Sequence, residues 1–128
     1  MKLFTTVTLL AAIAAAVNLQ HTNEAEIVLA EVLNNIVEHA YADQAGNITL
    51  RLVQHDGALH CTVSDTGAPM PGLCLPEGQF QPLKDLADLP EGGFGWFLIR
   101  SLTEGLTYQR SKGRNRLSFQ LPAKQSDA

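Results

Sequence analysis

The stretch NITLRLVQHDGALHCTVSD, residues 47–65, decides the fold class of this chain. It contains two runs, 47–55 and 58–65, that are rich in the residue types of half-buried β-strands. Asp56-Gly57 joins the runs, and Asp-Gly at this place is a strong signal for a two-residue hairpin turn. The stretch therefore predicts an antiparallel β-hairpin.

Upstream of this hairpin, the apolar residues are spaced as in a helix rather than as in a strand. EIVLAEVLNNIVEHAY, residues 26–41, predicts a helix that begins at a cap on Thr22 or Asn23 and ends near Tyr41. A further helix is expected over residues 4–17. The first 17 residues also resemble a secretory signal, but we favour a helix of the folded domain, because its removal would take a large apolar element from a small chain.

Downstream of the hairpin, residues 66–93 are rich in Gly and Pro and predict a long loop. A helix is expected from Phe94 to about Glu104, followed by strands over 106–111 and 115–121 with a turn at Lys112-Gly113. The order predicts one domain over residues 1–128. We expect an α/β two-layer sandwich, with a mixed, largely antiparallel sheet and helices on one face.

Composition excludes some classes of function. The 128 residues carry a formal net charge of −4, so the clustered basic surface of a nucleic-acid-binding protein is not expected. The amino-terminal apolar run is too short and too rich in Thr and Ala to predict a membrane span. Cys61 and Cys74 have no Cys or His at metal-binding spacing, and we interpret them as free thiols of a cytoplasmic protein.

The helix over 22–41 has an unusual polar face. At about 100° per residue, its polar side chains fall within an arc of about 140°, and these are Glu31, Asn34, Asn35, Glu38 and His39. A solvated face would more often carry Lys and Arg, which this arc lacks. Carboxylate and amide oxygens are ligands that Mg²⁺ prefers. Periodicity alone leaves a solvated face and a functional face as open alternatives.

Two glycine-containing segments could also serve a ligand. VSDTGAP, residues 63–69, places Asp65 and Gly67 at the end of a strand, although Asp-x-Gly is also an ordinary turn signal. EGGFGWFLIR, residues 91–100, places Gly92, Gly93 and Gly95 at the start of a helix, where backbone N–H groups favour an anion. A flexible loop before a helix explains the same glycines. Neither a Rossmann nor a P-loop pattern is present.

In this order the motifs resemble those of the GHKL ATPase superfamily, and within it the anti-sigma-factor serine/threonine kinases. EVLNNIVEHAY resembles the N box, VSDTGAP the first glycine box and LPEGGFGWFLIRSLTEGLTY the second, while GRNRLSFQLP resembles the closing strand. The resemblance runs from about Glu26 to Leu121. It implies a Bergerat-type ATP-binding fold, whose first strand has no counterpart in this sequence, so that an open sheet edge and a homodimer are expected.

The resemblance implies roles for individual residues. Glu31 corresponds to the general base that takes the proton of an attacking serine hydroxyl, and Asn35 to the Mg²⁺ ligand. Asp65 corresponds to the acceptor of the adenine amino group, beside Gly67, and His39 to a supporting hydrogen-bonding residue. The glycines of the second box correspond to the hinge and phosphate cradle of the ATP lid, and these are Gly92, Gly93 and Gly95.

The function that the resemblance implies is an ATP- and Mg²⁺-dependent protein serine/threonine kinase. It would sequester a sigma factor and phosphorylate a STAS-type anti-anti-sigma partner. Some members carry a basic residue just before the second glycine box, where this chain has Leu89, Pro90 and Glu91. A catalytically weak ATP-binding module for partner switching, and a detached histidine-kinase ATP-binding domain, are therefore kept as alternatives.

Overall fold

The computed structural model describes residues 22–77 and 93–122. The helix expected over residues 4–17 lies outside these ranges. The elements follow the predicted order. They are α2 (Thr22–Asn35), the π-helical turn η2 (Ile36–Ala40), β1 (Ile48–His55), β2 (Ala58–Asp65), the 3-10 turn η3 (Pro71–Leu73), α3 (Gly93–Leu102), β3 (Glu104–Ser111) and β4 (Arg114–Leu121).

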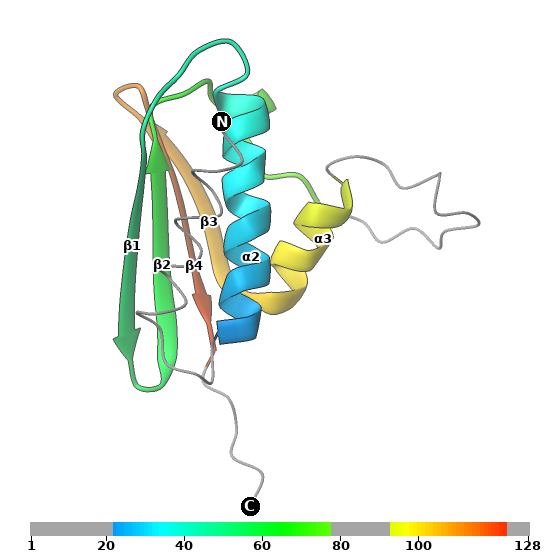
Figure 1. Ribbon diagram of the computed structural model, residues 1–128, viewed down its shortest axis with the longest axis vertical. Coiled ribbons are helices and arrows are strands. Elements are labelled where there is room, and N and C mark those ends of the chain that lie inside the picture. Colours follow the sequence, from blue (N-terminus) through cyan, green and yellow to red (C-terminus); the bar gives the residue numbers. More distant parts are fainter. Residues whose placement is uncertain (1–21, 78–92, 123–128) are drawn as a thin grey trace, which may run out of the picture.

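The described elements form two layers (Figure 1). The strands make one four-stranded sheet in the order β1-β2-β4-β3, and all three pairs of neighbours are antiparallel. Helices α2 and α3 pack on the same face of this sheet. The predicted α/β two-layer fold, with a largely antiparallel sheet and helices on one face, is confirmed.

Both hairpins turn where the sequence predicts. Asp56 and Gly57 have φ angles of 51° and 78°, and Lys112 and Gly113 have 51° and 76°. Two successive left-handed residues define a type I′ turn, whose twist matches that of the flanking strands. These local turns fix the registers of β1 with β2 and of β3 with β4.

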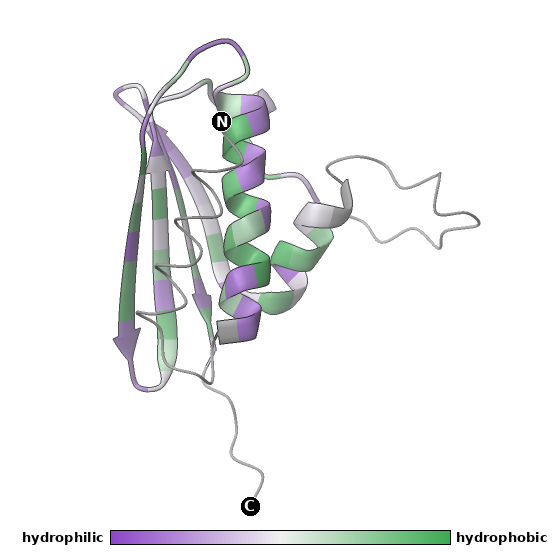
Figure 2. Cartoon of the chain, viewed as in Figure 1, coloured by the Kyte–Doolittle hydropathy of each residue, from purple (hydrophilic) through white to green (hydrophobic). Residues whose placement is uncertain are grey.

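The core lies between the sheet and the two helices. Figure 2 shows hydrophobic residues along the side of α2 that faces the sheet and hydrophilic ones along the side turned away. The buried residues of the hydrophobic core cluster come from α2, β2, α3 and β4. They are Ala25, Val28, Leu29, Val32, Leu33, Leu59, Cys61, Val63, Trp96, Ile99, Leu117, Phe119 and Leu121.

The second helix ends differently from the prediction of a regular helix to Tyr41. Its last turn is a π-helix, in which the backbone N–H of Tyr41 donates to the carbonyl of Ile36 at 3.0 Å. The carbonyl of Ala40 instead accepts a hydrogen bond from the N–H of Ala68 at 2.9 Å. A tertiary contact therefore accompanies the change of helix type.

The third helix and the strand after it also shift relative to the prediction. Helix α3 ends at Leu102, and the hydroxyl of Thr103 donates to the carbonyl of Ile99 at 2.7 Å, which satisfies a terminal helix carbonyl. Strand β3 begins at Glu104, two residues earlier than predicted, and has an irregular register between Glu104 and Thr107. Among the described residues, no helix is long and apolar enough to cross a membrane.

Candidate functional site

A cavity of about 280 Å³ opens between the carboxyl end of the α2–η2 helix and the sheet. It brings together Asn35, His39 and Asp65, which the sequence analysis had selected from separate motifs. Most of the other lining residues are apolar, and no Lys or Arg is among the described lining residues. The remaining lining residues are Val32, Ile36, Ala40, Ala68, Pro69, Met70, Pro71, Pro76, Trp96, Tyr108, Asn115 and Leu117.

The π-helical turn holds one wall of this cavity. Besides the bond between Ala68 and Ala40, the Tyr41 hydroxyl accepts a hydrogen bond from the N–H of Thr66 at 2.9 Å. The same hydroxyl donates to the carbonyl of Asn47 at 2.6 Å. π-Helical turns are rare and frequently occur at functional sites. Here the turn fastens the segment after β2 to the helix.

Gly67 lies in that fastened segment, and the close packing explains why it is a glycine. A Cβ atom at this position would lie 2.4 Å from the carbonyl oxygen of Ala40 and 2.7 Å from its carbonyl carbon. Because these are backbone atoms, no side-chain rotation relieves the clash. The glycine is required by close approach of two backbone segments.

Asp65 is the last residue of β2 and is 5% exposed. Its Oδ1 accepts a hydrogen bond from the N–H of Gly67 at 2.9 Å and another from Nδ2 of Asn115 at 2.8 Å. Among the described residues, no hydrogen bond involves its Oδ2. One carboxylate oxygen is thus committed to the protein, while the other remains for a ligand in the cavity.

Asn115 is a site residue that the sequence analysis did not select. It is 6% exposed, stands opposite Asp65 in the β2–β4 register, and lines the cavity. Its Oδ1 accepts hydrogen bonds from the Tyr108 hydroxyl at 2.6 Å and from Nη1 of Arg110 at 3.0 Å. The available signal was an asparagine at an inward position of a strand, since a buried amide needs polar partners.

Asn35 lies half-buried at the end of α2 and lines the cavity. Its Nδ2 is buried and has no hydrogen-bond partner among the described residues. An unsatisfied buried polar atom costs about 1–3 kcal/mol, so this amide is suited to a polar ligand in the cavity. Rotation about the side chain's terminal bond can present the amide oxygen instead. Asn35 can therefore supply the oxygen ligand that Mg²⁺ prefers.

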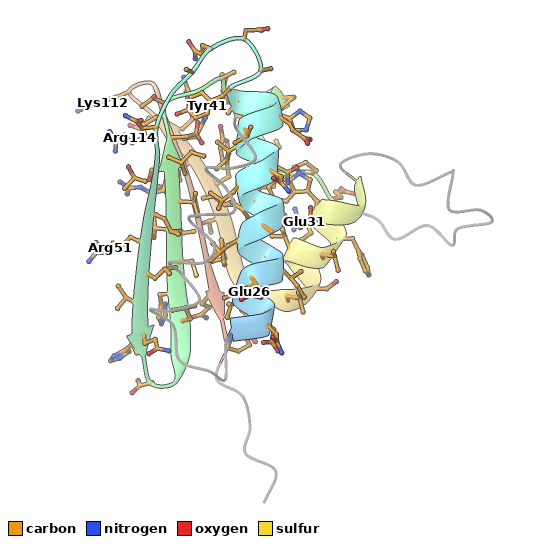
Figure 3. All side chains as sticks on the ribbon, in the orientation of Figure 1. Glu26, Glu31, Tyr41, Arg51, Lys112 and Arg114 are labelled. Carbon is orange, nitrogen blue, oxygen red and sulfur yellow. The ribbon has the colours of Figure 1, made fainter. Side chains whose placement is uncertain are left out.

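Glu31 lies one helical turn before Asn35 and contacts the start of α3. Figure 3 shows it where α2 faces α3. A Cβ at Gly95 would lie 2.6 Å from Oε2 of Glu31, so the absent side chain of Gly95 makes room for the carboxylate. Glu31 is half-buried and does not line the cavity itself. It lies on the side of α2 that faces α3.

The other predicted site residues contribute less to the lining of the cavity. His39 is exposed and lines the cavity, but its side chain forms no hydrogen bond with any residue that the structure describes. Gly93 is the first residue of α3, whose first backbone N–H groups have no partner within the helix. Gly92 lies outside the described residues.

The two cysteines are both free, as predicted. Cys61 is buried, and this burial raises the pKa of its thiol from 9.0 to about 12. Cys74 is exposed on the segment after η3, with its thiol 3.2 Å from the carbonyl of Gly72. No group of three or more His, Cys, Asp or Glu side chains that could hold a metal occurs within 22–77 and 93–122.

Comparison with known families agrees with this fold. Residues 3–121 match the family of the histidine kinase-like ATPase domain. The chain therefore belongs to the histidine kinase-like ATPase domain family. This membership implies that the chain binds ATP, and the resemblance to the GHKL superfamily inferred from the N box and the two glycine boxes is confirmed.

The chain is also similar to proteins named serine-protein kinase RsbW. It is 30% identical over 90 residues to the proteins of Bacillus mycoides (strain KBAB4) and Bacillus cereus (strain ATCC 10987 / NRS 248). It is 29% identical over 90 residues to the protein of Bacillus thuringiensis (strain Al Hakam). Each alignment covers 69% of this chain and 56% of the relative, so the chain spans about half the length of the curated relatives it matches.

Proposed function

We propose that this chain is an ATP-dependent protein serine/threonine kinase of the anti-sigma-factor type. The observation that carries the proposal is the convergence of Asn35, His39 and Asp65 on one cavity, with Glu31 one helical turn away. Its similarity to serine-protein kinases supports this class of activity.

Asp65 and the apolar walls would bind the nucleotide base. The free Oδ2 of Asp65 is suited to accept a hydrogen bond from an exocyclic amino group, while Ile36 and Met70 line the same cavity and offer apolar contact. The volume of about 280 Å³ is near the lower end of ligand pockets, so it suits the base and sugar rather than a whole nucleotide triphosphate. The phosphates would then extend toward Asn35 and the amino end of α3.

Asn35 would hold Mg²⁺ through its amide oxygen, together with phosphate oxygens and water. When bound, the ion would neutralise charge on the phosphates during transfer. Glu31 would orient the partner's serine hydroxyl and take its proton, since its carboxylate lies one helical turn from Asn35, on the side of α2 that faces α3. The absence of a side chain at Gly95 leaves room for this carboxylate.

The proposed partners are a sigma factor and a STAS-type anti-anti-sigma protein, and the proposed compartment is the cytoplasm. We further propose that residues 1–128 act as a single domain. The described sheet has β1 and β3 as its edge strands, and a homodimer could form along such an edge.

Calorimetry and phosphate transfer test the proposal. The wild-type chain should bind Mg²⁺-ATP and transfer labelled phosphate to serine of a STAS protein. Glu31→Gln should keep ATP affinity within about twofold yet slow transfer by about 10²–10⁴-fold, the usual contribution of a general base. Asn35→Ala should weaken Mg²⁺-ATP binding by about tenfold, because a polar contact contributes about 1 kcal/mol or more. No measurable binding of ATP by the wild-type chain would refute the proposal.

A second candidate is an ATP-binding partner-switch module that does not transfer phosphate. It is favoured by the sequence just before the second glycine box, where Leu89, Pro90 and Glu91 provide no cation to neutralise phosphates during transfer. The same assay separates the two functions. ATP binding without labelled serine, at any STAS protein concentration, would favour the module.

A further inference from the structure

In the described part of the chain, the outer side of the sheet, turned away from α2 and α3, carries four cations. The core is built from the inward residues of β2 and β4, so the alternate residues of each strand point outward. Arg51 on β1 and Arg114 and Arg116 on β4 lie at such positions and are exposed. Lys112 is exposed in the turn just before β4. Figure 3 shows Arg51, Lys112 and Arg114 on the side of the sheet away from the helices. We refer to the outer side around these four residues as the basic face.

The charges of the basic face are not balanced by other described residues. None of its four cations forms an ion pair or a side-chain hydrogen bond with a residue that the structure describes. Among the described strands, the one carboxylate at an outward position is that of Glu104, which pairs with Gln120 at the other end of β4. Soluble surfaces generally intersperse both signs of charge, whereas a field of a single sign steers a charged partner.

The rest of the protein has the opposite charge. The whole chain has a formal net charge of −4. The helix layer carries Glu26, Glu31 and Glu38, and the sequence from 22 to 41 contains no Lys or Arg. Figure 3 shows Glu26 and Glu31 on α2, on the helix side of the sheet. A negatively charged partner is therefore attracted to the sheet side of the molecule and repelled from the helix side.

The surface between the cations has groups that suit carboxylates. The strand registers place hydroxyl side chains beside the two central arginines, in the rows Thr49-Ser64-Arg116 and Arg51-Thr62-Ser118. Hydroxyl groups can donate a hydrogen bond to a carboxylate, and a guanidinium can bind one through two parallel N–H groups. These short side chains leave the long arginines accessible above a flat sheet.

We propose that the basic face is a docking surface for an acidic protein partner, which it binds through Asp and Glu carboxylates. This surface goes beyond the proposed kinase activity and is independent of phosphate transfer. Nucleic acid fits less well, because four cations are few for a phosphate backbone, to which a DNA-binding protein can make about 6–10 contacts. A membrane fits less well, because Val53 is the one large exposed apolar side chain at an outward position of the described strands. Two copies joined through this face would set cations against cations.

Fluorescence anisotropy of labelled poly-L-glutamate, titrated with the full chain, tests this inference. The wild-type chain should bind at low salt and lose binding at about 1 M NaCl, where the Debye length falls to about 3 Å. Arg51→Gln and Arg116→Gln should each weaken binding by about threefold, and together by about tenfold, because each exposed ion pair contributes modestly. Arg100→Gln is the matched control, since Arg100 is an exposed arginine on α3 and its loss changes the net charge equally. Its affinity should stay within about twofold of the wild-type value.

The outcomes separate this inference from the proposed function. Calorimetry should give the same ATP affinity for the wild-type chain and the double variant, because the cavity lies on the helix side of the sheet. A chain that binds poly-L-glutamate but no ATP overturns the proposed function alone. A chain that binds ATP but not poly-L-glutamate overturns the docking surface alone, as does an Arg100→Gln variant that is weakened as much as Arg116→Gln.

Three further results would assign the basic face to another occupant and so overturn the proposal. Tighter binding of polyuridylic acid than of poly-L-glutamate would indicate nucleic acid. Tighter binding of phosphatidylserine vesicles would indicate a membrane. Self-association in analytical ultracentrifugation that the double variant abolishes would indicate a second copy of the chain.

Discussion

Replacement of Gly67 by alanine tests the requirement for close packing between the segment after β2 and the π-helical turn. The new Cβ would lie 2.4 Å from the Ala40 carbonyl oxygen, 2.7 Å from its carbonyl carbon and 2.8 Å from its Cβ. Real Cβ contacts essentially never fall below 3.0 Å, so one of the two backbone segments has to move.

The cost follows from the contacts that this movement disturbs. Overpacking of a close contact costs about 1–3 kcal/mol. The hydrogen bond of 2.9 Å from Ala68 to Ala40 contributes about 1 kcal/mol more. We therefore expect the free energy of unfolding to fall by about 2–4 kcal/mol and Tm by about 6–15 °C. ATP affinity should fall by about tenfold, since the N–H of Gly67 also donates to Asp65.

Thermal unfolding followed by circular dichroism measures the first effect, and calorimetry with Mg²⁺-ATP the second. Gly72→Asn is a matched control on the same segment, because nothing lies within 4 Å of a Cβ there and its φ of +66° suits asparagine. The control should unfold within about 2 °C of the wild-type chain. If Gly67→Ala is as stable as this control, the close-packing argument is wrong.

Three further predictions concern Tyr41 and the two cysteines. Tyr41→Phe removes the hydroxyl that is hydrogen-bonded to the backbone of Thr66 and Asn47. The free energy of unfolding, measured in urea, should fall by about 1–3 kcal/mol. An unchanged value would show that these two hydrogen bonds do not stabilise the fold. At pH 8, iodoacetamide should modify Cys74 in the native chain and both Cys74 and Cys61 in denaturant, as mass spectrometry would detect. Burial raises the pKa of Cys61 to about 12 from 9.0, so above pH 9 the unfolded chain loses this proton first. Stability should therefore fall between pH 9 and 12, by up to about 1.4 kcal/mol per pH unit, and Cys61→Ala should lack this component; identical pH profiles would refute it.

Local chemistry explains which parts of the fold were predictable. Asp56-Gly57 and Lys112-Gly113 form the predicted turns, because the two-residue turn needs left-handed backbone angles that these residue types adopt. The apolar periodicity of α2 likewise identified the residues that are buried against the sheet, such as Leu29, Val32 and Leu33.

The end of α2 was not predictable in the same way. Residues 36–40 continue the helical pattern of the sequence, and no local signal distinguishes a π-helical turn from an α-helical one. The distinction accompanies a partner 28 residues away, Ala68, whose N–H takes the carbonyl of Ala40. Similarly, the irregular register near Glu104 depends on how β3 pairs with β4.

The candidate site shows the same division. Asn35, His39 and Asp65 were selected from the order of the motifs, because the side chain of each is by itself able to bind a ligand. All three line the cavity. Asn115 was not selected, because the role of an inward-facing asparagine depends on which residue lies opposite it in the sheet. That neighbour is Asp65, and the pairing follows from the β2–β4 register rather than from sequence distance.

By itself, the sequence determined the family, the order of the elements, the two hairpin turns and the buried face of α2, because these depend on residue type, on local spacing and on the order of motifs along the chain. Only the tertiary structure decided the π-helical turn, the enclosure of the cavity and the cluster of Tyr108, Arg110 and Asn115 behind Asp65. The physical reason is that hydrogen bonds and close contacts between distant segments depend on strand register and helix placement. A buried polar group is satisfied by whichever partner the fold brings within about 3 Å.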